Sequence, residues 1–260
     1  MATLKSRPTA VVTGAGQGIG QAIALELAKA GYHLGLQGRS QVRLQETAQR
    51  ISGEGSEAFV CPGDVTDPAS ADVLVEGAAA AFSPVEVAVS CAGQAYSAPL
   101  MTTDAEVFRR LFEVNVMAVL HLMKAAAGHM MAHGRPGRIV VIASTAAVRG
   151  ARYTSAYATS KHAAAGLVKS AAAEWTSHGI TVNAVCPGWV DTPMFDETLA
   201  RISEKTGRSP ERARERIETQ IPSGRVTQSE EVASLVRFLV SPRAAQVTGQ
   251  CWVMDGGEGL

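Results

Sequence analysis

A tyrosine and a lysine four residues apart are the side chains in this sequence best suited to proton transfer. They occur in an alanine-rich segment with a helical pattern, Ser155-Ala-Tyr157-Ala-Thr-Ser-Lys161, and on a helix this spacing places both side chains on one face. Using a phenol as an acid or base near pH 7 requires roughly 4 kcal/mol of stabilisation of the phenolate. An ammonium about 4 Å away supplies energy of that order at an effective dielectric constant of about 20. The pair is therefore a candidate catalytic pair, with an exposed surface pair as the alternative.

A glycine-rich turn near the N-terminus predicts a dinucleotide site. The β-branched run Thr9–Thr13 is followed by Gly14-Ala-Gly-Gln17-Gly18-Ile19-Gly20, and Gln21–Gly31 has helical periodicity. Glycines at 14, 18 and 20 let the backbone turn tightly and approach a pyrophosphate, which then lies at the positive end of the helix. A plain strand-to-helix loop is the alternative, but a glycine turn between a strand and a helix is the context that such a site requires.

The end of the next strand predicts which cofactor is bound. His33–Gln37 is typical of a strand and leads into Gly38-Arg39-Ser40, and no Asp or Glu lies between Gly31 and Gln45 to bind a free ribose diol. Arg39 and Ser40 instead offer a guanidinium and a hydroxyl, which suit a 2′-phosphate. Arg39 is the only cation that we expect there, because Gln17 adds no charge. NADP(H) is therefore preferred over NAD(H), which stays possible, and a solvated loop arginine is the alternative.

Helices and strands alternate along the rest of the chain. We expect helices at 44–53, 69–82, 105–131 and 229–239 and around Tyr157, and strands at 57–61, 85–90, 138–143, 180–185 and 250–254. This alternation predicts an α/β fold, a Rossmann-type doubly wound parallel sheet with helices on both faces, in one domain over residues 1–260. Such sheets bind ligands at the carboxyl ends of their strands. Those ends are Asp64-Val65, Cys91-Ala92-Gly93, Ser144 and Pro187-Gly188.

Three polar residues allow two interpretations each. Asp64 can contact an adenine edge or cap the helix after Pro68. Asn115 is centred in an apolar helical pattern, so we expect its amide to have a specific backbone or water partner, with simple burial as the alternative. Ser144 can cap a turn, although its position after a strand favours a site role.

Composition limits the classes of partner. The chain has 260 residues, is 46% hydrophobic and carries no net charge, which allows one large core and argues against a nucleic acid or a membrane as partner. Met1–Pro8 has no apolar core of the signal-peptide type, and no run of about 18 uncharged apolar residues follows. We therefore expect a cytoplasmic protein. The cysteines at 61, 91, 186 and 251 lack metal-ligand spacing, so we expect free thiols and no metal site.

Together these features resemble the short-chain dehydrogenase/reductase family over essentially the whole chain. The resemblance rests on Thr13-Gly14-x-x-x-Gly18-x-Gly20, Asp64, Asn115, Ser144, Tyr157-x-x-x-Lys161 and Pro187-Gly188, in that order. One departure is Ser90-Cys91-Ala92-Gly93, where the family usually has Asn-Asn-Ala-Gly. Residues 183–194 and the insert after them look most like polyketide ketoreductases, 3-oxoacyl-thioester reductases and 3-hydroxybutyrate dehydrogenases.

The resemblance implies a role for each site residue. Tyr157 would be the acid/base, and Ser144 would hold the substrate oxygen. Lys161 would lower the phenol pKa and bind the nicotinamide ribose, while Asn115 would hold a water that links Lys161 to solvent. No metal is needed. Further cofactor contacts are expected from the strand ends and the loop after Pro187, namely Val65, Cys91, Ala92, Gly93, Gly188, Val190 and Thr192, with Thr192 orienting the carboxamide.

The resemblance also implies a substrate lid over residues 192–225. Gln94, Tyr96, Arg149, Tyr153 and Trp189 are expected to line the pocket. Arginines at 208, 212, 214 and 216 could attract an anionic carrier or coenzyme A ester, but glutamates at 204, 211, 215 and 218 nearly neutralise them.

The resulting hypothesis is an NADP(H)-preferring oxidoreductase that acts on a carbonyl or secondary alcohol, with a 3-oxoacyl thioester or related ketone as the first substrate. An NAD-dependent secondary-alcohol or 3-hydroxybutyrate-type dehydrogenase is the enzymatic alternative. A non-catalytic nucleotide-sensing module is the other class, but such a protein would be expected to lose Tyr157 or Lys161. Alanines on more than one face of the Tyr157 helix, together with the resemblance, predict a homotetramer, or a dimer at least.

Overall fold

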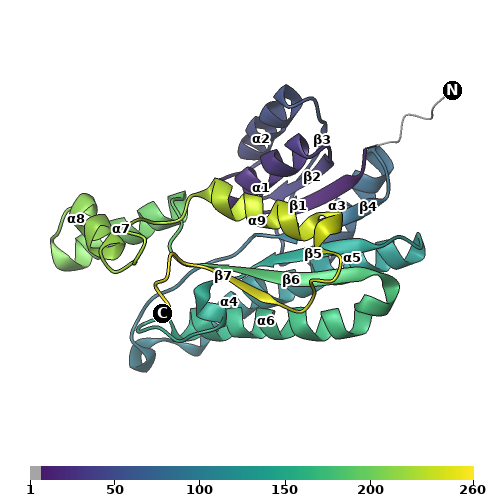
Figure 1. The fold of residues 1–260 in the computed structure, drawn as a ribbon. Coiled ribbons are helices and arrows are strands. Elements are labelled where there is room, and N and C mark those ends of the chain that lie inside the picture. Colours follow the sequence, from purple (N-terminus) through teal and green to yellow (C-terminus); the bar gives the residue numbers. More distant parts are fainter. Residues whose placement is uncertain (1–6) are drawn as a thin grey trace.

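Seven parallel strands form one sheet at the centre of residues 7–260, which are the residues that the computed structural model describes (Figure 1). The prediction that Met1–Pro8 has no signal-peptide core concerns residues that lie mostly outside this described range. The strands are β1 (Thr9–Thr13), β2 (His33–Gly38), β3 (Ala58–Pro62), β4 (Val85–Ser90), β5 (Gly137–Ile142), β6 (Ile180–Pro187) and β7 (Cys251–Met254). Their order is β3-β2-β1-β4-β5-β6-β7. The order reverses between β1 and β4, which is where ligands of such sheets bind.

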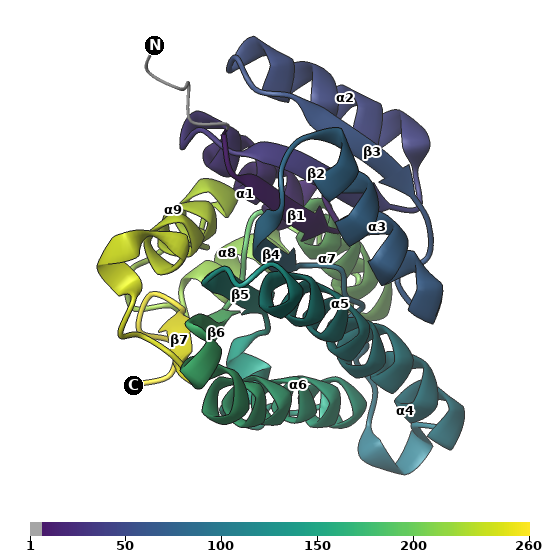
Figure 2. The same cartoon turned by 90° about the vertical axis from the view of Figure 1, so that its right-hand side faces the viewer.

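Helices cover both faces of the sheet (Figure 2). On one face lie α1 (Gly18–Lys29), α2 (Gln41–Gly53) and α9 (Ser229–Val240), whose apolar residues share a core with alternate residues of β1, β2 and β4. On the other lie α3 (Pro68–Ala81), α5 (Ala118–Ala132) and α6 (Ser155–Trp175), which form the second core. The predicted doubly wound α/β class is therefore confirmed.

The helix predicted over 105–131 is not continuous. It consists of α4 (Ala105–Phe112), a π-helical turn (Glu113–Met117) and α5. A π turn inserts one residue into the helical repeat and often marks a functional position, and Asn115 lies within it. By length and composition the segment 105–132 could cross a membrane, but half of its most apolar stretch is buried inside the protein, as in a core helix.

The first helix begins at Gly18 rather than at Gln21, so the glycine turn supplies its first residues. Gly14 and Gly18 have φ of 69° and 54°, which is left-handed backbone that favours glycine. The glycine turn therefore runs directly into α1, and the N-terminus of the helix lies at the last tight bend.

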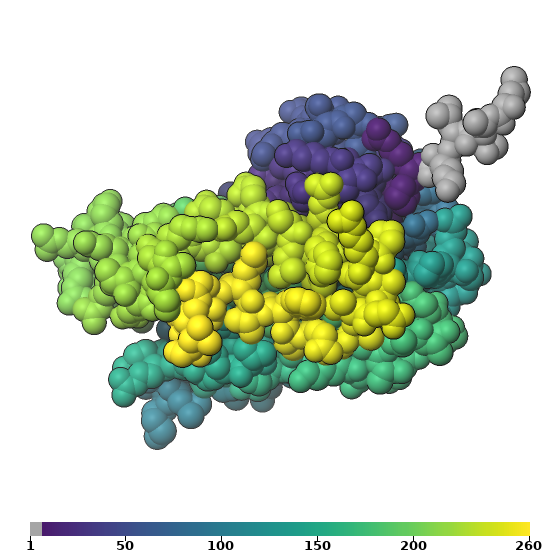
Figure 3. Space-filling model, viewed as in Figure 1, coloured from purple at the N-terminus to yellow at the C-terminus, as the bar shows by residue number. Residues whose placement is uncertain are grey.

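The insert before α9 forms two helices, α7 (Pro193–Thr206) and α8 (Pro210–Glu218), which project from the body (Figure 1). They have a small core of their own, made of Phe195, Leu199, Ala213, Ile221 and Val226. In Figure 3 they overhang a notch beside the C-terminal residues. Short 3₁₀ turns elsewhere include η1 (Leu100–Thr102), η3 (Thr145–Ala147), η4 (Thr176–His178) and η5 (Pro242–Ala244).

Candidate active site

Tyr157 and Lys161 lie one turn apart on α6. Lys161 Nζ is 5.8 Å from the centroid of the Tyr157 ring and donates to the carbonyl of Ile142 at 3.1 Å. The lysine is only 6% exposed. Burial raises the pKa of the Cys91 thiol to about 12, and the positive charge of Lys161 lowers it by a smaller amount. The structure thus holds an ammonium in an enclosed position beside the phenol, as the spacing predicts.

Ser144 follows β5 and caps the η3 turn, against which α6 packs. Its Oγ accepts a hydrogen bond from the backbone N–H of Ala146 at 3.1 Å. A hydroxyl has a second lone pair and a proton of its own. The capping role and the site role are therefore compatible, because the O–H group stays available to donate to a substrate oxygen.

Asn115 connects the π turn to the loop after β4. Its Oδ1 accepts from the N–H of Gln94 at 2.9 Å, and its Nδ2 donates to the Gln94 carbonyl at 2.9 Å and to Ser160 Oγ at 3.0 Å. The expected backbone partner is therefore present. Both N–H groups are engaged, so only the second lone pair of Oδ1 can take a water, and the water relay stays a prediction.

Ser160 is a site residue that the sequence interpretation missed. It is 1% exposed, and its Oγ donates to the Tyr157 carbonyl at 2.8 Å while accepting from Asn115. It therefore joins the π turn to the backbone of Tyr157. The available signal was a hydroxyl beside Lys161 in an otherwise alanine-rich segment.

The glycine turn fits closely against the end of β4. A Cβ on Gly14 would lie 2.9 Å from the Ala92 nitrogen, and one on Gly20 would lie 2.2 Å from the Gly14 oxygen. Thr13 Oγ1 accepts from the N–H groups of Cys91 at 3.1 Å and Ala92 at 3.2 Å. This threonine holds the strand end where the chain departs from Asn-Asn-Ala-Gly. The resulting cradle, without side chains at its bends, fits a pyrophosphate.

The loop after β6 closes the same cradle. Thr192 Cγ2 lies 3.2 Å from the position of a Cβ on Gly18, and its Oγ1 caps α7 by accepting from Phe195 N at 3.4 Å. Gly188 N donates to Met254 O at 3.0 Å, and Val190 pairs with Thr227. At the next strand end, a Cβ on Gly93 would lie 3.5 Å from Lys161 Nζ. Of the predicted cofactor residues after Pro187, Thr192 therefore meets the glycine turn, whereas Gly188 and Val190 contact the C-terminal strand and the segment before α9.

At the ribose end, Asp64 does not cap a helix. Its Oδ1 accepts from the N–H and hydroxyl of Thr66 at 2.9 and 2.8 Å, and these bonds hold the pKa of Asp64 below its ordinary value, with a smaller contribution from Arg39. Asp67 caps α3 instead, accepting from Ala69 N at 3.0 Å. The capping alternative for Asp64 is wrong, while its adenine contact and that of Val65 stay predictions.

Arg43 brings a second guanidinium to the glycine turn, which the sequence interpretation did not include. Ser40 caps α2 by accepting from Arg43 N at 3.4 Å, and the guanidinium of Arg43 donates to Gln17 Oε1. Arg43 was missed because the contact depends on how α2 docks on the glycine turn. Its only sequence signal was a basic residue one turn beyond the strand end.

The expected substrate residues are only partly brought together. Gln94 and Tyr96 are half-buried after β4, and Trp189 packs on Phe195 with ring centroids 5.6 Å apart. Tyr153 is exposed, has a φ of 67° and accepts from Ala98 N at 2.8 Å. Positive φ in a tyrosine is strained.

Arg149 is engaged elsewhere. It donates to Glu258 at 2.7 Å and lies 3.7 Å from Asp255, which argues against the predicted substrate contact. In the same C-terminal segment, the carbonyl oxygen of Gly256 accepts a hydrogen bond from the backbone N–H of Ser223 at 3.1 Å. The C-terminal residues therefore join the loop after η3, which carries Arg149, to the segment that follows α8.

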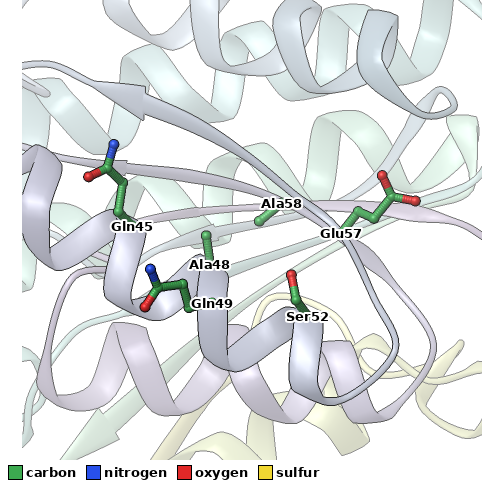
Figure 4. Close-up of a pocket in the computed structure, with 6 residues that line it drawn as sticks. All are labelled: Gln45, Ala48, Gln49, Ser52, Glu57 and Ala58. Carbon is green, nitrogen blue, oxygen red and sulfur yellow. The ribbon is translucent and has the colours of Figure 1, made fainter.

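A hollow of about 580 Å³ lies away from these residues, between α2 and the edge strand β3 (Figure 4). Its lining is Gln45, Ala48, Gln49, Ser52, Glu57 and Ala58. The hollow contains none of the side chains gathered around Tyr157.

Comparisons with known proteins agree with this geometry. Residues 14–258 match the family model described as Enoyl-(Acyl carrier protein) reductase. The chain is 37% identical over 256 residues, 98% of this chain and 94% of the relative, to a protein named as ketoacyl reductase 1 of the granaticin polyketide synthase of Streptomyces violaceoruber. It is 36% identical over 250 residues, 95% of this chain and 97% of the relative, to L-2,3-butanediol dehydrogenase of Corynebacterium glutamicum.

A solved structure shares the whole architecture. The F189W actinorhodin polyketide ketoreductase with NADPH superposes with a TM-score of 0.93 at 36% identity, covering 100% of this chain and 99% of that chain. The printed names of these relatives include ketone reductases and alcohol dehydrogenases, which catalyse opposite directions of one chemistry.

Proposed function

The chain belongs to the short-chain dehydrogenase/reductase family, and we propose that it reduces a ketone with NADPH as the preferred cofactor. Its family makes it an oxidoreductase that transfers a hydride between a nicotinamide cofactor and a carbonyl or alcohol. The first substrate class is a 3-oxoacyl thioester or related β-ketone. The observation that carries the proposal is the buried Lys161 ammonium beside Tyr157, in a fold whose glycine turn fits a dinucleotide.

The residues of this chain divide the chemistry between them. The bound cofactor supplies or accepts the hydride. Ser144 donates its O–H to the substrate oxygen, and Tyr157 gives that oxygen a proton during reduction or removes one during oxidation. Lys161 stabilises the phenolate that is left and binds the ribose. Asn115 and Ser160 hold the backbone on which Tyr157 lies.

The proposed roles of Ser144 and Tyr157, which both donate a hydroxyl proton to one substrate oxygen, favour a carbonyl over the carbon–carbon double bond in the family model's description. The ketoacyl reductase and ketoreductase names of the relatives support the same choice. The butanediol dehydrogenase relative supports the alternative of an NAD-dependent secondary-alcohol dehydrogenase.

The lid helices α7 and α8, with Gln94, Tyr96, Tyr153 and Trp189, are proposed to select the substrate. The enzyme is proposed to act in the cytoplasm.

An activity panel with both cofactors tests the proposal. We expect faster oxidation of NADPH than of NADH with a β-keto thioester, and Tyr157→Phe should lower turnover roughly 100-fold or more with cofactor binding nearly unchanged. Near-normal turnover of Tyr157→Phe would remove the tyrosine from its role. Faster NAD-dependent oxidation of a vicinal diol than any ketone reduction would favour the alternative.

Arg39→Asp tests the cofactor preference. The substitution removes the charge that suits a 2′-phosphate and provides a carboxylate for a ribose diol, so it should reverse the preference towards NAD(H). A wild type that prefers NAD(H), with Arg39→Ala changing neither affinity, would make Arg39 a solvated loop residue.

The assembly is proposed to be a symmetric homotetramer. The alanines of α6 include exposed and half-buried positions, such as Ala163 and Ala173, which suit close helix contacts across a two-fold axis. Light scattering should give a mass four times that of the 27.1 kDa chain, and a monomer at micromolar concentration would refute the assembly.

A further inference from the structure

We propose that Arg43 is a second cation for the 2′-phosphate of NADPH and therefore a specificity-determining residue. It would reach the phosphate from α2, while Arg39 reaches it from the end of β2. This inference rests on the proposed NADPH preference and adds a residue of this chain to it.

The position of Arg43 is set by two contacts with the glycine turn. Its guanidinium donates to Oε1 of Gln17, the residue at the N-cap of α1. Its Cβ lies 3.1 Å from the position of a Cβ on Gly16. The first turn of α2 therefore lies directly against the glycine turn, and a positive charge lies where that turn itself carries only a neutral amide.

The helix that carries Arg43 is fixed in place by a buried threonine. Thr47 is 0% exposed, and its Oγ1 lies 3.1 Å from the carbonyl oxygen of Ala15 and accepts from Gln21 Nε2 at 2.9 Å. Because this hydroxyl ties α2 to the strand-to-helix turn, the backbone that carries Arg43 is held against the glycine turn before the cofactor arrives. Pre-placement of this kind reduces the entropy lost on binding.

The charge of Arg43 is available to a ligand. Arg149, Arg214 and Arg225 form ion pairs with carboxylates. Over residues 7–260 Arg43 forms no such pair, and its described side-chain partner is the neutral amide of Gln17. A guanidinium that is bound to a neutral amide can exchange the amide for a phosphate oxygen. A hydrogen bond between a guanidinium and a phosphate is about twice as strong as one between neutral groups.

Arg39 and Arg43 also flank the position of the ribose. In this fold class the adenosine ribose lies beyond the second strand, and β2 ends at Gly38, directly before Arg39. Arg43 lies one helical turn further along the chain, and its side chain extends back to the glycine turn. Two cations from different elements can contact different oxygens of one phosphate, which a neutral ribose diol does not require.

Binding titrations of the full chain test the role of Arg43. The ligands are NADPH, NADH and adenosine 2′,5′-bisphosphate, and the variants are Arg43→Ala and Arg50→Ala. Arg50 is a matched control, because it lies on the same helix and also donates to a glutamine amide oxygen, Gln21 Oε1, at 2.7 Å. Arg43→Ala should weaken NADPH and the bisphosphate about tenfold and NADH by less than about twofold, whereas Arg50→Ala should leave all three nearly unchanged.

The outcomes separate this inference from the proposed function. Unchanged NADPH affinity in Arg43→Ala, or equal weakening of NADPH and NADH, would overturn the role of Arg43 at the 2′-phosphate. A wild type that binds both cofactors equally would overturn the proposed preference instead, and a selective loss of NADPH binding in Arg43→Ala would still support the contact. Circular dichroism and melting of both variants exclude a loss of fold.

Discussion

The region around the glycine turn and the projecting helices α7 and α8, which we propose form a lid, are held together by different forces. In the first, backbone packs on backbone: the glycine turn touches its own first residue and the end of β4, at distances that leave no space for a Cβ. In the proposed lid, five buried side chains form a separate small core. Arg214 ties α8 to the loop after β6 through Asp191 at 2.7 Å, and it forms a second ion pair within α8, with Glu218 at 3.0 Å.

This difference matches what each region is proposed to bind. A dinucleotide has the same phosphates in every turnover, so a rigid steric cradle suits it. A substrate must enter and leave, and half-exposed ion pairs contribute little enough to be broken and remade. Substitutions should therefore act through steric overlap in one region and through charge in the other.

The largest effect should come from breaking the steric fit with Gly20→Ala. The new Cβ would lie 2.2 Å from the Gly14 oxygen, so the turn must shift, at a cost of at least about 1 to 3 kcal/mol of unfolding free energy. NADPH binding should fall with it, as measured by melting and titration. Gly53→Ala, at the end of α2 with nothing within 4 Å of its Cβ position, is the control and should change stability by less than about 1 kcal/mol. Normal melting and NADPH affinity in Gly20→Ala would contradict the steric account.

A smaller effect should follow Arg214→Met in the lid. Methionine keeps apolar contact with Phe195, over whose ring the guanidinium carbon lies at 5.6 Å, but it loses the bonds to Asp191 and Glu218. Because these groups are about one-third exposed, we expect a loss of about 1 kcal/mol, seen as a roughly fivefold higher KM for the ketone. The Kd for NADPH should not change.

Arg216→Met is the matched lid control, because Arg216 forms no ion pair within the described part of the chain and should tolerate the change. An NADPH affinity that falls as much as the KM rises in Arg214→Met would show that the two regions are not separable.

The smallest effect should appear where the regions meet, at the pair of Arg225 and Glu231. Arg225, together with the N–H of Gln228, lowers the pKa of Glu231 to about 2. A lowered pKa stabilises the fold above the ordinary value of about 4.3, and this contribution is lost as the pH falls towards the lowered value. Glu231→Gln should therefore melt slightly below the wild type at pH 7, with the difference shrinking below about pH 4.3.

The Glu231 effect should be a few degrees at most, because the two side chains are 57% and 38% exposed and surface pairs contribute little. Calorimetry across this pH range measures the effect, and Glu230→Gln is the neighbouring control. A difference that stays constant with pH would assign the change to helix capping rather than to charge.

Much of the fold followed from local pattern. The strands Thr9–Thr13 and Val85–Ser90 were predicted to the residue, because β-branched runs between turn residues have few alternatives. The start of α1 was placed three residues late because glycine normally disfavours a helix. The π turn at Glu113–Met117 could not be predicted, because one extra residue in an apolar helix changes neither the composition nor the visible periodicity of the segment.

The site was predictable where function depends on one element and not where it depends on two. Tyr157 and Lys161 share a helix, so their spacing was sufficient, and their neighbourhood is confirmed. Arg43 and Ser160 contact Gln17 and Asn115, which lie on other elements, and no local sequence pattern predicts how two elements dock. The ion pair of Arg149 could not be predicted for the same reason, since Glu258 lies 109 residues away in the chain.

The tail contact of Arg149 has a consequence for changing substrate range by exchanging lids between relatives. Gly256 accepts a hydrogen bond from Ser223, next to the proposed lid, and Glu258 accepts one from Arg149 in the loop after η3. A chimera that takes only residues 193–225 from another protein would therefore pair a lid from one parent with a C-terminal segment from the other. A chimera that exchanges residues 255–258 together with the lid would keep the contact between these two segments. The practical unit of exchange is thus two segments far apart in the sequence.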